Sequence, residues 1–190
     1  MAGDAAGPGA VHNAGVHLLF VCTGNICRSP TAERLAATLA ARDPIPDFRT
    51  SSAGTRAVIG HPVHRESARV LADLGGDPAG FTARQLTAKI AADADLVLAL
   101  TKAHRDTVLE LAPRQLHRTF TLTEAAQLAT QFDPGSVKDL SALRPQLRAE
   151  QSPDVPDPIG QSPEVFDRVG NQIADLLGPI VEFCRRASRP

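Results

Sequence analysis

The stretch Val16–Glu33, VHLLFVCTGNICRSPTAE, constrains the fold more than any other part of the chain. Its first part, Val16–Val21, shows no polar–apolar alternation, which is typical of a strand buried on both faces of a parallel sheet. A loop follows over Cys22–Arg28. Ser29 then predicts a helix N-cap and Pro30 the first helical position, where no backbone donor is needed. The sequence therefore predicts a strand that leads, through a short loop, into the N-terminus of a helix.

The residues of this loop are those of an anion-binding site. Unpaired N–H groups of a loop and of a helix start, together with the helix dipole, form a concave site for a tetrahedral anion. Cys22 enters this positive field first, and the field favours its nucleophilic thiolate form. Arg28 offers a planar fork for two anion oxygens, while Gly24 and Asn25 tolerate unusual backbone angles. These residues alone leave a second interpretation open, a strand-to-helix turn around a buried cysteine.

The segment Cys22–Ser29, CTGNICRS, resembles the signature of the low-molecular-weight protein tyrosine phosphatases. Ser51–Thr55, Ala83–Leu86 and Asp157-Pro158 resemble later segments of the same family, in the same order. The resemblance extends from about Val16 to Arg186. It implies a three-layer α/β fold, with helices on both faces of a four-stranded parallel sheet in the order 2-1-3-4 and a phosphate-binding loop after strand 1. Alternation of predicted strands and helices independently favours such a parallel sheet.

The resemblance also implies an activity, the hydrolysis of phosphotyrosine and other aryl phosphate monoesters by a bacterial-type enzyme without metal or cofactor. Cys22 would attack phosphorus and form a phosphocysteine, and Asp157 would protonate the leaving group and later activate water. Arg28 would bind the phosphate. The resemblance assigns Thr23, Gly24, Asn25, Ile26, Cys27 and Ser29 to substrate binding, with Ser29 next to the sulfur, Ser52 to support of Asn25, and Ile159 to the mouth of the site.

Three of these assignments have a structural alternative. Ser52 is also a plausible strand-end hydroxyl, and Asp157 a turn residue, since Asp-Pro pairs favour turns. Cys27 allows a reversible disulfide with Cys22 that protects the nucleophile from over-oxidation, or simple packing.

Two positions depart from the family pattern. Phe81 stands where the family usually has a histidine, so a brace from that histidine to Asn25 must be replaced or lost here. Ile159 stands where members that act on phosphotyrosine often have an aromatic residue, which predicts weaker aryl binding or a wider mouth.

Three rival functions share this fold or loop. In protein-arginine phosphatases a threonine tends to occupy the place of Ile26, so Ile26 favours the tyrosine branch. Thioredoxin-coupled arsenate reductases need a cysteine pair around residues 80 to 105, and none is present there. A non-catalytic phosphate-sensing or partner-binding protein would not need Cys22, Arg28 and Asp157 together.

Composition narrows the remaining possibilities. The 190 residues, 43% hydrophobic and 22% charged, fit one domain, which we expect over residues 16–187. A net charge of −1 gives no case for nucleic-acid or membrane binding. Three cysteines are too few for a secreted disulfide framework and suit a reducing compartment. Residues 1–15 predict a disordered tail and show no secretory signal. We therefore expect a cytoplasmic protein. We expect a monomer whose partner is a phosphorylated protein or a small phosphate ester. His61 and His64 lack further metal ligands at suitable spacing.

The rest of the chain predicts further elements and one uncertain segment. Residues 132–156 are expected to form an insertion or mobile segment that flanks the mouth of the site, or a peripheral insertion with a short helix over 140–150. The last helix carries an apolar stripe. Strands are predicted over 48–52, 95–100 and 118–122, and helices over 30–42, 62–74, 87–92, 102–112, 123–130 and 163–186.

Overall fold

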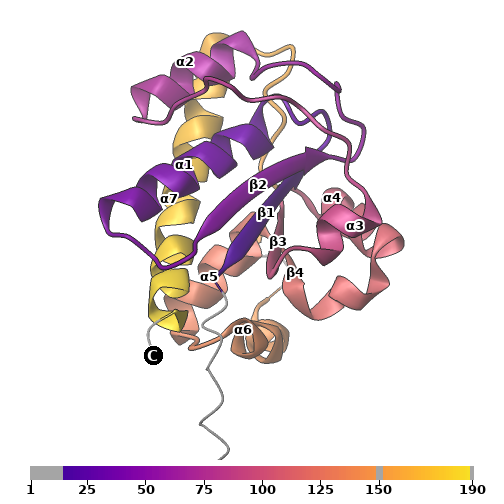
Figure 1. Cartoon of the computed structure of the whole chain (residues 1–190), viewed down its shortest axis with the longest axis vertical. Coiled ribbons are helices and arrows are strands. Elements are labelled where there is room, and N and C mark those ends of the chain that lie inside the picture. Colours follow the sequence, from indigo (N-terminus) through magenta and orange to yellow (C-terminus); the bar gives the residue numbers. More distant parts are fainter. Residues whose placement is uncertain (1–14, 149–151, 189–190) are drawn as a thin grey trace, which may run out of the picture.

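The computed structural model describes residues 15–148 and 152–188, which form a sheet with helices on both faces (Figure 1). Four strands, all parallel, lie in the order β2-β1-β3-β4, as predicted. Because the strands are parallel, their carboxyl ends meet at one edge of the sheet, and Cys22 is the last residue of the first strand. The strands are β1 (His17–Cys22), β2 (Arg49–Gly54), β3 (Leu96–Ala99) and β4 (Thr119–Thr121).

Helices cover both faces of this sheet, as the family resemblance implies. The larger hydrophobic core joins one face to α1 (Arg28–Arg42), α5 (Leu122–Phe132) and α7 (Pro163–Ala187). The smaller core joins the opposite face to α3 (Ala88–Ala92) and α4 (Lys102–Leu111). A 3-10 turn, η1 (Pro113–Arg118), follows α4, and α2 (Arg65–Asp73) packs against α1 and α7.

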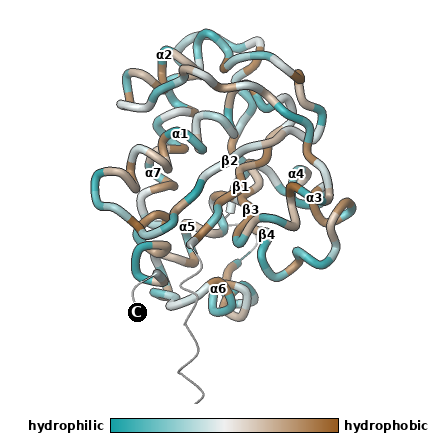
Figure 2. The backbone as a smooth tube through the Cα atoms, in the orientation of Figure 1, coloured by the Kyte–Doolittle hydropathy of each residue, from teal (hydrophilic) through white to brown (hydrophobic). Residues whose placement is uncertain are grey.

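The central strand explains why its sequence lacks alternation. Leu18 and Phe20 belong to the larger core, whereas Leu19 and Val21 belong to the smaller one, and all four side chains are fully buried. Hydrophobic residues therefore follow one another along β1, and Figure 2 shows hydrophobic colour concentrated along the inner strands.

Helices α1 and α2 begin two and three residues from their predicted starts. The first begins at Arg28, with Cys27 as N-cap, because the hydroxyl of Ser29 is used in contacts with the loop and does not cap the helix. The second begins at Arg65 and not at Pro62, because the His64 side chain accepts a hydrogen bond from the Glu66 N–H and so caps the helix.

The segment after α5 contributes to both edges of the sheet. It forms α6 (Val137–Leu143) and a short 3-10 turn, η2 (Arg144–Gln146). Helix α6 packs against α5 and η1 and lines a cavity together with Asp95. The N–H of Asp95 donates to the His17 carbonyl at the start of β1. This helix thus lies at the amino edge of the sheet, away from Cys22, and residues 152–157 return to the carboxyl edge.

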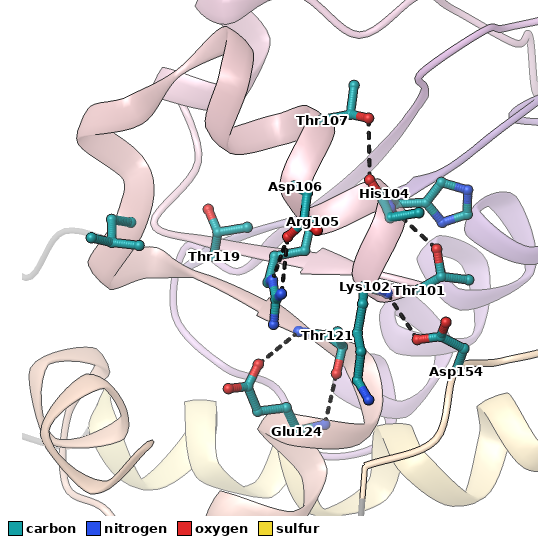
Figure 3. Close-up of polar contacts among 12 residues, drawn as sticks. Thr101, Lys102, His104, Arg105, Asp106, Thr107, Thr119, Thr121, Glu124 and Asp154 are labelled. Atoms are coloured by element: carbon teal, nitrogen blue, oxygen red, sulfur yellow. Dashed lines mark hydrogen bonds and ion pairs between the residues drawn. The ribbon is translucent and has the colours of Figure 1, made fainter. Parts of the chain in front are cut away.

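A buried histidine connects the smaller core to the loop after β1. His104 lies in the first turn of α4 and is 6% exposed. Its Nε2 is 2.8 Å from the hydroxyl of Thr23, and its Nδ1 has no hydrogen-bond partner in the described part of the chain. Figure 3 shows the ring turned away from Arg105 and Glu124. Burial lowers the pKa of His104 to about 4, so the imidazole is neutral at pH 7.

This buried histidine predicts an acid-sensitive stability. Unfolded chains bind a proton at His104 below about pH 6.5, whereas the folded protein does so only near pH 4. The free energy of unfolding therefore decreases by about 3 kcal/mol from this group as the pH falls from 6.5 to 4. Urea unfolding of wild type and His104→Gln across this range tests it, and we expect a shallower decline in the variant.

The exposed His117, changed to Gln, is the control for the same substitution at the surface, and the decline in this variant should match that of the wild type. Parallel curves for His104→Gln and wild type would contradict the expectation.

Candidate active site

The loop after β1 turns its carbonyl groups outward. Five of the six carbonyls from residues 22 to 27 accept N–H groups from outside the loop. Because the N–H and C=O of a peptide point in opposite directions, these bonds leave loop N–H groups free to face an anion. The bonds are Thr55 N to Cys22 O (2.9 Å), Arg56 N to Thr23 O (2.9 Å), Val58 N to Gly24 O (2.9 Å), His64 N to Ile26 O (2.7 Å) and Thr31 N to Cys27 O (3.2 Å).

Gly54 allows the chain after β2 to approach this loop closely. A Cβ atom at Gly54 would lie 2.5 Å from the carbonyl oxygen of Thr23, a distance that real Cβ contacts do not reach. Its backbone also bonds the next segment, receiving the Leu86 N–H and donating to the Arg84 carbonyl. A glycine is therefore required where β2 meets the loop.

Asn25 holds the loop in its shape. Its φ is +56°, a left-handed conformation that asparagine tolerates better than most residues, and it is fully buried. Its Nδ2 donates to the hydroxyls of Ser29 (2.9 Å) and Ser52 (2.8 Å), and its Oδ1 accepts the Arg84 N–H (2.8 Å). The contact with Ser52 is the one that the family resemblance implies.

Phe81 shows how this network forms without the usual family histidine. Its ring packs with Val63 and Ala83, so no side-chain donor from this position reaches Asn25. The Arg84 backbone N–H bonds Asn25 Oδ1, and Ser52 is held from the other side by Glu33 Oε2 at 2.6 Å. Burial raises the pKa of Glu33, although its bond from Ser52 acts in the opposite direction.

The sulfur of Cys22 lies at the base of the site, with the residue only 2% exposed. Its Sγ is 3.0 Å from the Ser29 hydroxyl and 3.3 Å from the Asn25 N–H. Since the Ser29 oxygen already accepts a hydrogen bond from Asn25, its own proton is available to the sulfur. Two donors therefore face Sγ, an arrangement that stabilises a thiolate.

Arg28 and Asp157 meet across the opening. The arginine is buried and donates to the Asp157 carboxylate (2.9 Å) and to the Val155 carbonyl (3.0 Å). The aspartate side chain is half exposed, and its second oxygen accepts the Ile159 N–H. The structure thus brings together Cys22, Arg28 and Asp157, as the sequence predicts.

The segment before Asp157 is held at the carboxyl edge by three hydrogen bonds. Val155 N donates to the Leu100 carbonyl (2.9 Å), and Asp154 accepts the Lys102 N–H (2.8 Å, Figure 3). The Thr123 hydroxyl donates to the Pro153 carbonyl (2.9 Å). These bonds to the segments after β3 and β4 keep the candidate acid above the loop.

These residues enclose a cavity of about 410 Å³. Asn25, Ser29 and Ser52 do not line it, because their side chains bond one another behind the cavity and shape the loop. Sequence reasoning missed Arg56 and Val58, which line the wall, and His104, which contacts Thr23 from behind. Arg56 and Val58 could have been identified by their place directly after β2, which brings them beside the loop. The lining is formed by Cys22, Thr23, Gly24, Ile26, Cys27, Arg28, Arg56, Val58, Asp157 and Ile159.

Cys27 is a buried residue of the loop and packs with Val70 and Phe166. Burial raises the pKa of its thiol to about 12, so the group is protonated at neutral pH. A protonated thiol is a poor nucleophile, which favours packing as its main role. A disulfide between Cys27 and Cys22 stays a prediction.

The described residues lack two features of other classes of protein. Within residues 15–148 and 152–188, no group of three or more His, Cys, Asp or Glu side chains is placed to hold a metal ion. No helix in these same ranges is both long and apolar enough to cross a membrane.

Comparisons with known proteins agree with this geometry. Residues 17–187 match the model of the family "Low molecular weight phosphotyrosine protein phosphatase". The chain is 39% identical over 102 residues to the low molecular weight protein-tyrosine-phosphatase Etp of Escherichia coli, a match over 54% of this chain and 66% of Etp, just under two thirds of its length. It is 30% identical to PtpB of Staphylococcus epidermidis, named as a phosphatase of the same kind, over 86% of this chain and 95% of PtpB.

Among solved structures, the arginine phosphatase YwlE from Geobacillus stearothermophilus superimposes with a TM-score of 0.69 at 28% identity, over 88% of this chain and 91% of YwlE. The fold is therefore shared by enzymes named for different phosphorylated residues. The family match extends over both the loop at Cys22 and the segment that contains Asp157. The chain belongs to the low-molecular-weight phosphotyrosine protein phosphatase family.

Proposed function

We propose that this protein hydrolyses phosphotyrosine in phosphorylated proteins through a phosphocysteine on Cys22. The observation that carries the proposal is a nucleophile with two hydrogen-bond donors at the base of a cavity, with Arg28 and Asp157 at the same opening. We place the activity in the cytoplasm, where free cysteines stay reduced.

The reaction begins when the phosphate enters the loop. The loop N–H groups and Arg28 hold its non-bridging oxygens, and the Cys22 thiolate attacks phosphorus in line with the leaving oxygen. The S–P bond forms as the P–O bond breaks, and Asp157 gives its proton to the departing phenolate. Its carboxylate then takes a proton from the water that attacks the phosphocysteine, and the Ser29 hydroxyl stabilises the thiolate that leaves.

The depth and walls of the cavity favour tyrosine over the shorter serine. Because Cys22 is 2% exposed, a substrate must carry its phosphate on a long side chain to reach the sulfur. Ile26, Val58 and Ile159 present apolar surface along that path and can contact an aromatic ring. Ile26 also lacks a hydroxyl that would assist attack on the P–N bond of phosphoarginine.

The test of this proposal is phosphate release from three peptides that differ only in the modified residue, phosphotyrosine, phosphoarginine or phosphoserine, without added metal. We expect the highest kcat/KM for phosphotyrosine, because its ring fits the apolar walls. Cys22→Ser should abolish turnover of every peptide. The matched control is Cys184→Ser, which makes the same change in the core of α7, away from the cavity, and should retain activity.

Two results would overturn the assignment. A higher kcat/KM for phosphoarginine would place the enzyme in the other branch of the family, despite Ile26. Turnover by Cys22→Ser would exclude the phosphocysteine mechanism.

The acid role of Asp157 predicts a dependence on the leaving group. Asp157→Asn should reduce kcat for a phosphotyrosine peptide by roughly 10²- to 10⁴-fold, the usual range for loss of a general acid. The loss should be much smaller for 4-nitrophenyl phosphate, because its leaving phenolate needs little help from a proton. Steady-state kinetics with both substrates measure the difference.

Asp154→Asn is the matched control, since the asparagine still accepts the Lys102 N–H and the residue does not line the cavity. It should keep both activities near wild type. An equal loss on both substrates in Asp157→Asn would contradict a proton-donor role.

A further inference from the structure

Arg56 is a cation in the wall of the cavity, and no carboxylate of the described residues is paired with it. Two guanidinium groups line the cavity, those of Arg28 and Arg56, and one carboxylate, that of Asp157. The carboxylate is paired with Arg28 at 2.9 Å. No acidic group within residues 15–148 and 152–188 forms an ion pair with Arg56, which is exposed to solvent. The wall thus keeps one positive charge that the catalytic groups do not neutralise.

The backbone of Arg56 is held against the phosphate-binding loop. Its N–H donates to the Thr23 carbonyl, and the N–H of Ala57 bonds the Gln85 side chain at 3.0 Å. Val58 is bonded in turn to Gly24. The base of the Arg56 side chain therefore has a defined position relative to the loop, while its charged end stays free at the rim.

The surroundings of Arg56 suit a segment of a substrate protein. Val58 and Ile159 are 38% and 47% exposed and line the same cavity, and Ile59, which follows Val58, is 68% exposed. Apolar surface beside an unpaired arginine lowers the competition from water for the guanidinium. A planar guanidinium binds a carboxylate with two parallel hydrogen bonds.

We propose that Arg56 binds an acidic side chain next to the phosphotyrosine of the substrate and so determines sequence preference. This inference rests on the proposed phosphotyrosine activity and specifies its substrate class. The phosphate occupies the loop and Arg28, and a neighbouring Asp or Glu of the same peptide reaches Arg56 at the rim. The interaction steers binding and does not enter the chemical step.

Two phosphotyrosine peptides test the proposal, one with Asp on both sides of the modified residue and one with Asn at the same positions. The wild type should have a kcat/KM about three- to fivefold higher for the acidic peptide, mostly through KM, in the range of an exposed ion pair. The ratio should fall toward one in Arg56→Gln, and also in the wild type as salt is raised, since salt screens exposed charges.

Arg49→Gln is the matched control. Arg49 is an exposed arginine at the start of β2, whereas Arg56 follows the end of this strand, so the variant has the same net charge as Arg56→Gln, and it should keep the wild-type ratio. A ratio of one in the wild type, or a ratio kept in Arg56→Gln, would overturn the assignment of Arg56. An equal loss on both peptides in Arg56→Gln would overturn it too, since it would mean that Arg56 binds the phosphate.

The two proposals fail in different ways. No hydrolysis of either peptide by the wild type, under conditions where phosphoarginine peptides are cleaved, would overturn the phosphotyrosine activity itself. Hydrolysis of both peptides at equal rates would leave that activity in place and overturn only the role of Arg56.

Discussion

The outward direction of the carbonyl groups in the loop after β1 is the constraint on which the rest of the site depends. A loop of this length would satisfy its carbonyls with water or with its own N–H groups if left alone. Here the N–H groups of Thr55, Arg56, Val58 and His64 take them instead. The loop N–H groups are left to face the cavity, so the suitability of the loop for an anion depends on how neighbouring segments are placed.

That placement follows from the sheet order. Because β2 lies beside β1 and runs parallel to it, the chain leaving Gly54 passes directly alongside the loop leaving Cys22. On the other side, the chain after β3 brings His104 against Thr23 and brings the Leu100 carbonyl to the Val155 N–H, just before Asp157. The chain after β2 therefore forms the wall of the site, the end of β1 forms its base, and the chain after β3 supports it. This arrangement explains why residues far apart in sequence converge there.

Much of the fold was predictable from sequence, because strands buried on both faces, such as β1 and β3, contain uninterrupted runs of hydrophobic residues. The site was predictable in part. The cysteine and arginine lie in one short segment, but Asp157 is 129 residues from Arg28 and was found through the family resemblance, since Asp-Pro alone indicates only a turn. The capping of α2 by His64 and the contact of His104 with Thr23 depend on specific side-chain hydrogen bonds, which periodicity does not encode.

The ion pair between Arg28 and Asp157 joins the loop after β1 to the segment that carries the aspartate. The guanidinium of Arg28 lines the cavity, and the Asp157 carboxylate neutralises its charge there. An anion that enters the loop competes with Asp157 for this guanidinium and weakens the ion pair. Anion binding is therefore linked to release of the Asp157 side chain, so the occupancy of the loop is communicated to a segment 129 residues further along the chain.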